Sequence, residues 1–445
     1  MTRRVAMFSE HASPVALLGG VDAGGQNVYV DAVSRGLTAH GCETDVFTVR
    51  NDPDLPEVMA WADGVRVINV PAGPSGPRAK DALWPHMPAF RDAIDRFAAR
   101  GGRRYDLIHG NFWMSGWVAA ELGLRWRVPT VQIFHATGVT KAREQGAADT
   151  SPSQRIEVER AVVRTVDRLI AQCPAERDEL LRDYGARAEQ IALIPSAVDV
   201  ERFRPLANDV ARRMLGIEPD ALVIAYVGRI VPRKDVRNLI RAFAQLKAQW
   251  LAAGVSPIPT IFVVGGESEH PDPAATAEIG VLCELAEALG VLGDVRFTGR
   301  KQPHELHRWY AAADVTVTTP WYEPFGLTPL EAMACGTPVI GSNVGGIAYT
   351  IVDGETGFLV PPHNPRALCA RLDELLKSSA LRMRMGQAGR ARVLRAFTWD
   401  HVAARTAALY DDLLASRDMS PSSYRRQSLG LHEAATMGRS GGVSA

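Results

Sequence analysis

The sequence predicts an α/β protein with two domains, each built on a parallel β-sheet that helices cover on both faces. Three observations predict this class. Short apolar runs alternate with amphipathic segments, as in sheets whose strands are buried on both faces. The alternation breaks over residues 200–220 and then begins again at Leu222. The length of 445 residues suits two or three domains.

The expected strands are short apolar runs, and the segments between them carry helical periodicity. In the first half the strands are Val5–Ser9, Val65–Val70, Asp106–His109, Thr130–Phe134, Leu169–Ala171 and Ile191–Ile194. In the second half they are Leu222–Val227, Thr260–Val264, Val295–Thr298, Val315–Thr318, Val339–Ile340 and Gly357–Val360. Val30, Val33 and Leu37 share one helical face, as do Leu239, Phe243 and Leu246.

Composition excludes several functional classes. Lys+Arg and Asp+Glu number 50 each, and this neutral balance argues against a general nucleic-acid binder or a polybasic membrane anchor. Five separated cysteines without a CxxC or Cys/His cluster argue against disulfides and zinc, and fit a reducing cytosol. No run approaches the roughly 20 apolar residues of a membrane span. Arginines 91, 96, 100, 103 and 104 leave peripheral membrane contact open, although Asp92 and Asp95 favour a solvated face. Nothing in the sequence fixes the oligomeric state.

A glycine-containing loop follows the first strand. The segment SEHASPVALLGGVDAGGQNVYV places Gly19, Gly20, Gly24 and Gly25 before a helix expected to begin near Gln26. Glycines let the backbone approach a phosphate, and a helix N-terminus attracts negative charge. The spacing differs from a dinucleotide GxGxxG fingerprint. Taken alone, the motif fits a phosphate contact and a flexible glycine turn equally well.

A basic turn follows the strand Leu222–Val227. The chain runs into Gly228 and Arg229, and Lys234 comes five residues later. These two cations at the carboxyl end of a strand suit a diphosphate, because arginine binds phosphate oxygens in a bidentate way and lysine acts as a compact point charge. Taken alone, a solvated turn with Arg233, Lys234 and Arg237 is the simpler interpretation.

The most informative segment is TTPWYEPFGLTPLEAMACGTPVIGSNVGG. Glu323 lies in a Pro/Gly/aromatic loop without an obvious structural partner. The run from Thr328 to Glu331 has the form of a capping box, so Glu331 could be a helix cap and nothing more. We expect the amides of Leu327 and Thr328 to point into a cleft between the domains. A loop carboxylate with such amides could bind polyol hydroxyls and a phosphate together.

Single polar residues elsewhere are harder to interpret. His135 ends an apolar strand, where ligand-facing groups of α/β proteins usually lie. A satisfied structural histidine is the alternative for His135, and His109 has the same ambiguity. Lys80 and Arg155, each taken alone, would be solvated surface cations.

Together these segments resemble the retaining GT-B glycosyltransferases of family 4. The nearest branch contains sucrose-phosphate synthases and the inositol-phosphate N-acetylglucosaminyltransferase of mycothiol synthesis. SEHASP…GGVDAGGQNVYV resembles the N-terminal signature of that branch, EPFGLTPLEAMACGTPVIGSNVGG its paired-glutamate motif, and VGRIVPRK its diphosphate clamp. The resemblance runs from about Arg3 to Tyr410.

The resemblance implies a GT-B fold, with two Rossmann-like domains facing across a cleft. The first domain would cover residues 1–205 and receive a return helix at about 400–415, and the second would cover residues 206–399. Residues 418–445, rich in Ser, Gly and Arg, would form a disordered tail.

The resemblance also implies roles. Arg229 and Lys234 would neutralise the diphosphate of a nucleotide-sugar donor, Glu331 would hold the ribose, and Glu323 would bind the transferred sugar. His135 would contact the 6-hydroxyl and the reacting face of that sugar. The implied catalytic residues are Glu323, His135, Arg229 and Lys234. The implied donor-binding residues are Gly24, Gly25, Arg229, Lys234, Arg300, Glu323, Phe325, Gly326, Leu327, Thr328 and Glu331. The implied acceptor-binding residues are Gly25, Asn27, Lys80 and Arg155.

We therefore expect a cytoplasmic hexosyltransferase with a UDP-linked donor and a sugar, sugar-phosphate or glycan acceptor. The resemblance implies retention by front-side attack, in which the departing phosphate helps to deprotonate the acceptor, with no metal and no cofactor. Phe112 stands where the inositol-phosphate enzyme has an aromatic hydroxyl, so neither inositol phosphate nor fructose 6-phosphate is carried over as the acceptor. A GDP- or ADP-linked donor, and a nucleotide-sugar-binding protein without transfer activity, stay open as alternatives. The long first loop disfavours a Rossmann dehydrogenase.

Overall fold

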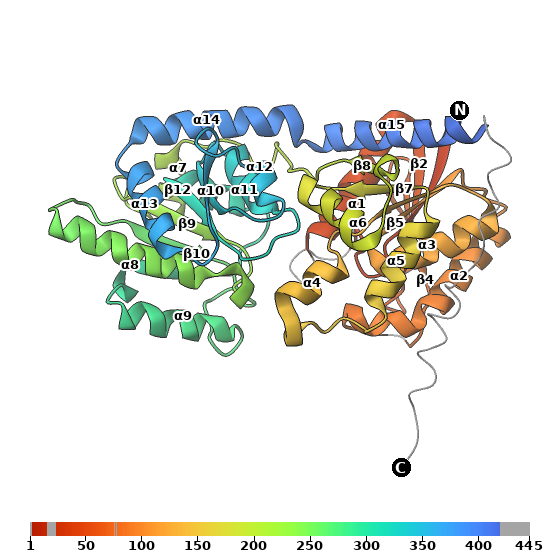
Figure 1. Ribbon diagram of the computed structural model, residues 1–445, viewed down its shortest axis with the longest axis horizontal. Helices are drawn as coiled ribbons and strands as arrows, with labels where there is room; N and C mark the ends of the chain where they lie inside the picture. The colour runs from red at the N-terminus through yellow and green to blue at the C-terminus, as the bar shows by residue number, and fades with distance from the viewer. Residues whose placement is uncertain (1, 16–23, 75, 77, 419–445) are drawn as a thin grey trace, which may run out of the picture. The chain divides into compact units, whose positions relative to one another are not determined.

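The computed structural model describes residues 2–15, 24–74, 76 and 78–418. The chain divides into two compact units, Met1–Pro195 with Trp399–Ala445, and Ser196–Thr398. Each unit contains one sheet flanked by helices (Figure 1). The predicted class, two Rossmann-like domains on parallel sheets, is confirmed. The tail predicted over residues 418–445 lies, from residue 419 onward, outside the described residues.

The sheet of the first unit has eight strands in the order β3-β4-β2-β1-β5-β6-β7-β8. Only the edge strand β3 is antiparallel to its neighbour. The strands are β1 (Arg3–Phe8), β2 (Cys42–Val49), β3 (Val58–Ala62), β4 (Val65–Val70), β5 (Leu107–Asn111), β6 (Thr130–Ile133), β7 (Arg168–Ala171) and β8 (Ile191–Leu193). The sequence did not predict β2 or β3. Polar Thr44, Asp45 and Thr48 interrupt β2, although all three are buried in the fold.

Asp45 shows how the fold tolerates a carboxylate in a central strand. Its oxygens accept two hydrogen bonds from Arg66 at 2.7 and 2.8 Å and one from the Tyr105 hydroxyl at 2.6 Å. These bonds offset the cost of taking the charge out of water.

The first unit has seven α-helices among its described residues. They are α1 (Gly25–Gly36), α2 (Met87–Arg100), α3 (Phe112–Trp126), α4 (Gly138–Gln145), α5 (Arg155–Thr165), α6 (Pro174–Tyr184) and α15 (Trp399–Asp418). Short 3₁₀ turns are η1 (Leu37–His40), η2 (Lys80–His86), η3 (Gly146–Ala148) and η4 (Ala188–Gln190). Helix α15 packs against α1 so closely that a Cβ at Gly36 would lie 2.7 Å from the Cβ of Ala403. The C-terminal helix is therefore part of the first unit.

The sheet of the second unit has six parallel strands in the order β11-β10-β9-β12-β13-β14. They are β9 (Val223–Val227), β10 (Thr260–Val264), β11 (Val295–Gly299), β12 (Val315–Thr318), β13 (Val339–Ser342) and β14 (Gly357–Val360). The helices are α7 (Asn208–Leu215), α8 (Val236–Ala252), α9 (Ala277–Ala288), α10 (Leu306–Ala312), α11 (Leu327–Ala334), α12 (Ile347–Thr350), α13 (Pro365–Leu376) and α14 (Ser379–Ala396), with 3₁₀ turns η5 (Pro232–Lys234) and η6 (Leu292–Asp294). All six strands coincide with predicted apolar runs to within two residues. No helix in the described part of the chain is long and apolar enough to cross a membrane.

Each sheet has a topological switch point, the place in the sheet where the strand order reverses direction. The strands on one side of this point follow one another in one direction along the sheet, and those on the other side follow in the opposite direction. In the first unit, β1 lies between β2 and β5, and in the second unit, β9 lies between β10 and β12. The loops after these strands diverge and leave a crevice at the carboxyl ends, which is where α/β sheets bind ligands. Each unit therefore has a predicted ligand position that follows from topology alone.

Two adjacent glycines fix the loop that follows β12. A Cβ at Gly345 would lie 2.0 Å from the Glu323 carbonyl oxygen, and a Cβ at Gly346 would lie 2.2 Å from that of Phe325. The Gly346 amide donates to the Glu323 carbonyl at 3.3 Å. The VGG segment therefore supports the backbone that carries Glu323.

We expect Gly346→Ala to destabilise the second unit. The backbone of Gly346 has φ −72°, which alanine tolerates, so the cost comes from the forced displacement of the Phe325 backbone. Overpacking of this kind costs about 1–3 kcal/mol, or several degrees in the melting temperature of a unit of this size. Gly293→Ala is the matched control, since a Cβ there meets nothing within 4 Å. Equal melting temperatures for the two variants, measured by calorimetry, would contradict the packing argument.

Candidate active site

The switch point of the second unit brings three charged side chains together. Lys234, in the turn after β9, forms an ion pair with Glu323, in the loop after β12. The Arg233 guanidinium lies 3.7 Å from the same carboxylate oxygen. These side chains are only 14–27% exposed. A carboxylate and two cations are thus held together in a partly desolvated crevice.

The surroundings of Glu323 favour its ionised form. Burial acts to raise the pKa of this carboxyl, but Lys234 and then Arg233 outweigh it and hold the pKa below its usual value. Burial lowers the pKa of Lys234, against the opposing effect of Glu323. The charge on Glu323 therefore depends on the two cations beside it.

Glu331 lies within α11 and is not a helix cap. Helix α11 begins at Leu327, its N-cap is Gly326, and no side chain caps it. The capping-box prediction for the run Thr328–Glu331 is therefore wrong, because the helix starts before Thr328. Glu331 accepts a 2.6 Å hydrogen bond from the Tyr310 hydroxyl instead. Burial raises the pKa of Glu331, and the bond from Tyr310 opposes this shift.

The other second-unit residues that were predicted to bind the donor lie at the carboxyl ends of the strands of the same sheet. Leu327 and Thr328 form the first turn of α11, where backbone amides have no intrahelical partner. Phe325 is buried, and Gly326 has φ +84°, a left-handed conformation that favours glycine. The Arg229 side chain is exposed beside β9. Arg300 follows β11, and its buried Nε has no hydrogen-bond partner.

In the first unit, the glycine loop ends as an open helix start. Gly24 is the N-cap of α1, a Cβ there would meet nothing within 4 Å, and Gly25 begins the helix. Asn27 holds this start in place, because its side chain accepts from the Gly24 amide at 3.1 Å and donates to the Ser13 carbonyl at 2.9 Å. The predicted glycines Gly19 and Gly20 lie outside the described residues.

His135 lies just beyond β6 with its backbone in the left-handed region, at φ +59°. Its Nε2 lies 3.1 Å from Oδ1 of Asn111, and the Tyr29 ring packs edge-on against it at 4.9 Å. An amide oxygen only accepts, so Nε2 carries the proton and Nδ1 is left as an acceptor. Burial, with smaller effects of His109 and His11, lowers the pKa of His135 to about 3. His135 is thus neutral, and its backbone is in a conformation that few non-glycine residues adopt.

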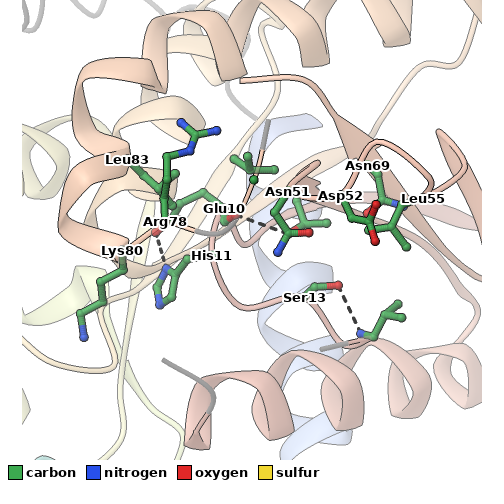
Figure 2. Close-up of a pocket in the computed structure, with 14 residues that line it drawn as sticks. Glu10, His11, Ser13, Asn51, Asp52, Leu55, Asn69, Arg78, Lys80 and Leu83 are labelled. Atoms are coloured by element: carbon green, nitrogen blue, oxygen red, sulfur yellow. Dashed lines mark hydrogen bonds and ion pairs between the residues drawn. The ribbon is translucent and has the colours of Figure 1, made fainter. Parts of the chain in front are cut away.

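A pocket of about 470 Å³ lies at the switch point of the first unit (Figure 2). Its lining includes Lys80, Arg78 and Asp52 together with Glu10 and His11, which follow β1. Lys80 therefore lies at a cavity, and its predicted role in acceptor binding stays a prediction.

Arg155 is not among the residues that line this pocket. Its side chain is 2% exposed, and the guanidinium donates to Glu159 at 2.8 Å, to Ser151 at 3.1 Å and to the Ala136 carbonyl. It also lies 5.0 Å from the centre of the Phe112 ring. The predicted roles of Lys80 and Arg155 in acceptor binding stay predictions, with Lys80 at the pocket and Arg155 engaged in bonds within the unit.

Several residues at these crevices escaped the sequence prediction. Arg233 was interpreted as part of a solvated turn, and Tyr310, Glu10 and His11 were not singled out. Only the position of Glu10 and His11 directly after the first strand could have suggested them. Among the described residues, no group of three or more His, Cys, Asp or Glu side chains could hold a metal ion.

Comparison with known proteins agrees with this architecture. Residues 208–392 match the family described as glycosyl transferases group 1, and residues 24–197 match the glycosyl transferase 4-like domain. The D-inositol 3-phosphate glycosyltransferase of Streptomyces bingchenggensis is 39% identical over 93% of this chain and 90% of its own length. The corresponding protein of Corynebacterium diphtheriae is 35% identical over 93% and 95%.

A solved structure is also similar. The sucrose-phosphate synthase of Thermosynechococcus elongatus superposes with a TM-score of 0.81 at 35% identity, and the match covers 93% of this chain and all of that one. Both sequence and structure thus agree over nearly the whole chain. The protein is a glycosyltransferase that belongs to group 1, family 4, with the GT-B fold.

Proposed function

We propose that this glycosyltransferase transfers a hexose from a UDP-linked donor to a hydroxyl of a sugar, sugar phosphate or glycan, with retention of anomeric configuration. The observation that carries the proposal is the charged crevice of the second unit. Lys234 and Arg233 lie beside Glu323 there, and Glu331 projects from the adjacent helix. This set offers cations for a diphosphate and carboxylates for sugar and ribose hydroxyls.

The chemical task of the crevice is to stabilise the leaving group. When the bond between the sugar and the diphosphate breaks, negative charge grows on the phosphate oxygens. Preorganised cations and helix-start amides stabilise such charge in a partly desolvated site. Lys234, Arg233 and Arg229 supply the cations and the first turn of α11 supplies the amides, so the proposal requires no metal and no cofactor.

The first unit is the proposed acceptor-binding unit. Its switch-point pocket is lined by Lys80 and by several hydrogen-bonding side chains, which suit a polyol with or without a phosphate. The names of the relatives support the phosphorylated case, since they act on D-inositol 3-phosphate or make sucrose phosphate.

The proposed domains are residues 1–205 with the helix near 400–415, and residues 206–399. The proposed location is the cytoplasm.

A thermal-shift comparison with UDP, GDP and ADP tests the donor class. A nucleotide present at 100 times its Kd stabilises the protein by about 2.7 kcal/mol. We expect a rise in melting temperature with UDP that GDP and ADP do not match. A larger rise with GDP or ADP would replace the UDP proposal by that nucleotide, and no rise with any of them would contradict the diphosphate-binding role of the crevice.

Glu323→Gln should separate sugar recognition from nucleotide binding. The ion pair with Glu323 competes with a diphosphate for Lys234, so removal of its charge should leave UDP affinity unchanged or tighter. Loss of a contact to the transferred sugar should lower kcat by roughly 10²–10³-fold. Calorimetry with UDP and steady-state kinetics measure the two effects. Parallel loss of both would contradict the placement of Glu323 on the sugar.

Lys80→Ala should raise the acceptor KM selectively if the acceptor is phosphorylated. Loss of one charge-assisted bond costs about 1.5–3 kcal/mol, or roughly 10–100-fold. The same variant should change the KM of an unphosphorylated acceptor little. Lys377→Ala, at an exposed pair with Asp373, is the control. An unchanged KM for every acceptor would remove Lys80 from the site.

A further inference from the structure

Two ionisable side chains of the second unit adjoin the crevice and have no part in the roles described so far. Asp235 directly follows Lys234 and is the N-cap of α8, and His363 lies in the loop after β14. His363 Nδ1 lies 2.9 Å from Oδ2 of Asp235. The Asp235 side chain is 6% exposed and that of His363 is 60% exposed, so a nearly buried carboxylate is paired with an imidazole at the surface.

Both residues have backbones in the left-handed region, where residues other than glycine are uncommon. The φ angle is +51° at Asp235 and +54° at His363. Glycine adopts this conformation at lower cost, so the contacts of the two side chains are informative. Oδ1 of Asp235 accepts from the Asn238 amide at 3.2 Å and caps α8. A glycine N-cap is only slightly weaker, so capping is a small part of what the Asp235 side chain contributes.

The second oxygen of Asp235 depends on His363. Oδ2 is buried, and no described residue gives it a hydrogen bond of good geometry. Its ion-pair partner is the His363 ring at 2.9 Å. A buried carboxylate without a partner is unfavourable, so this contact stabilises the observed orientation of the Asp235 side chain. Although Asp235 adjoins Lys234 in the chain, the lysine pairs with Glu323 instead.

His363 also contacts the loop that follows β12. Its ring centre lies 5.1 Å from that of Trp321, with 32° between the ring planes. The Trp321 amide donates to the Arg233 carbonyl at 3.2 Å. The turn η5 thus has Trp321 bonded to it at Arg233 and is followed by Asp235, and His363 contacts both of these neighbours. One imidazole therefore connects the loops that follow β9, β12 and β14.

The backbone that carries His363 is anchored independently of this contact. The next residue, Asn364, is the N-cap of α13, and its side chain accepts from the Ala367 amide at 2.9 Å. Helix α13 in turn packs against α8, the helix that Asp235 caps. His363 therefore meets Asp235 from a supported position and can restrain the short turn η5.

We propose that His363 and Asp235 are positioning residues for the cations of the crevice. The inference rests on the proposed function, in which Arg233 and Lys234 bind the diphosphate of the donor. Both cations lie in η5, a turn of three residues. Without the imidazole, the binding of a diphosphate would have to order this turn, at a cost in affinity. The Asp235–His363 contact therefore preorganises the cations for the charge of the leaving group.

The first test needs no ligand. Hydrogen–deuterium exchange of the full-length protein, followed by mass spectrometry, reports on the amides of Lys234, Asp235 and Trp321, which all donate hydrogen bonds in or to the turn. His363→Gly keeps the left-handed backbone and removes the imidazole. We expect these amides to exchange roughly 10–100-fold faster in His363→Gly, as for the loss of one contact to a charged group.

Arg127→Gly is the matched control for the exchange test. It makes the same kind of backbone change at φ +57°, at an exposed position of the first unit. Exchange in the turn should therefore match the wild type in this variant. Unchanged exchange in His363→Gly would overturn the proposal, whatever the enzyme transfers.

The second test compares the affinities of UDP and UMP by calorimetry. These ligands differ by one phosphate group, so the ratio of their Kd values reports on the cations that hold the diphosphate. We expect His363→Gly to raise the Kd of UDP roughly 10-fold and that of UMP less. His363→Asn should stay close to the wild type, because the asparagine amide can replace Nδ1 as a donor to Asp235 and asparagine tolerates the left-handed backbone. A lower melting temperature with an unchanged ratio would indicate a purely structural role and overturn the proposal.

A double-variant cycle tests whether the two residues act together. Asp235→Gly keeps the backbone conformation and costs little as an N-cap, but it removes the partner of His363. We expect Asp235→Gly, and the double variant with His363→Gly, to show the same loss of UDP affinity as His363→Gly alone. Additive losses would overturn the proposal. If the wild type binds UDP no better than UMP while the exchange result is as expected, the diphosphate role of the crevice fails and the restraint of the turn by His363 stands.

Discussion

The crossing of the chain at the switch points is the constraint on which both candidate sites depend. Lys234 and Glu323 are 89 residues apart, yet they meet because β9 and β12 are neighbours in the sheet. The loops after β9 and β12 leave the carboxyl ends of these strands in divergent directions. The space between the two loops must therefore be filled or bridged. Right-handed crossovers leave few other arrangements for a parallel sheet. The first unit has the same arrangement at β1 and β5. Glu10 and His11 follow β1, and Phe112 follows β5.

The two crevices solve different electrostatic problems. In the second unit the cations are held by a carboxylate of the same chain, so the protein does not bury unpaired positive charge. In the first unit the buried histidines stay neutral, since burial lowers the pKa of both His109 and His135 to about 3. The second unit thus holds paired charges beside β9, whereas His109 and His135 of the first unit are neutral.

Most of the fold could be predicted from the sequence, because buried parallel strands are continuous apolar runs. The prediction failed at β2, where the buried Asp45 is stabilised by Arg66, Arg103 and Tyr105, partners that no local pattern reveals. The sequence left a helix cap open for Glu331, and only the start of α11, with Gly326 as its N-cap, excludes that alternative; the predicted role in donor binding stays a prediction. Arg233 and Lys234 are adjacent in the sequence, and only the path of the Glu323 loop shows that both face the same carboxylate.

Arg155 shows how far a family resemblance can be carried to single residues. The position matches, but here Glu159, Ser151 and the Ala136 carbonyl use the guanidinium, and the Phe112 ring covers it. Glu159 also accepts from the Gly138 amide and the Tyr184 hydroxyl, so it could not leave Arg155 without leaving those groups unpaired. A phosphate at Arg155 would have to compete with these internal bonds, whereas Lys80 and Arg78 line a cavity.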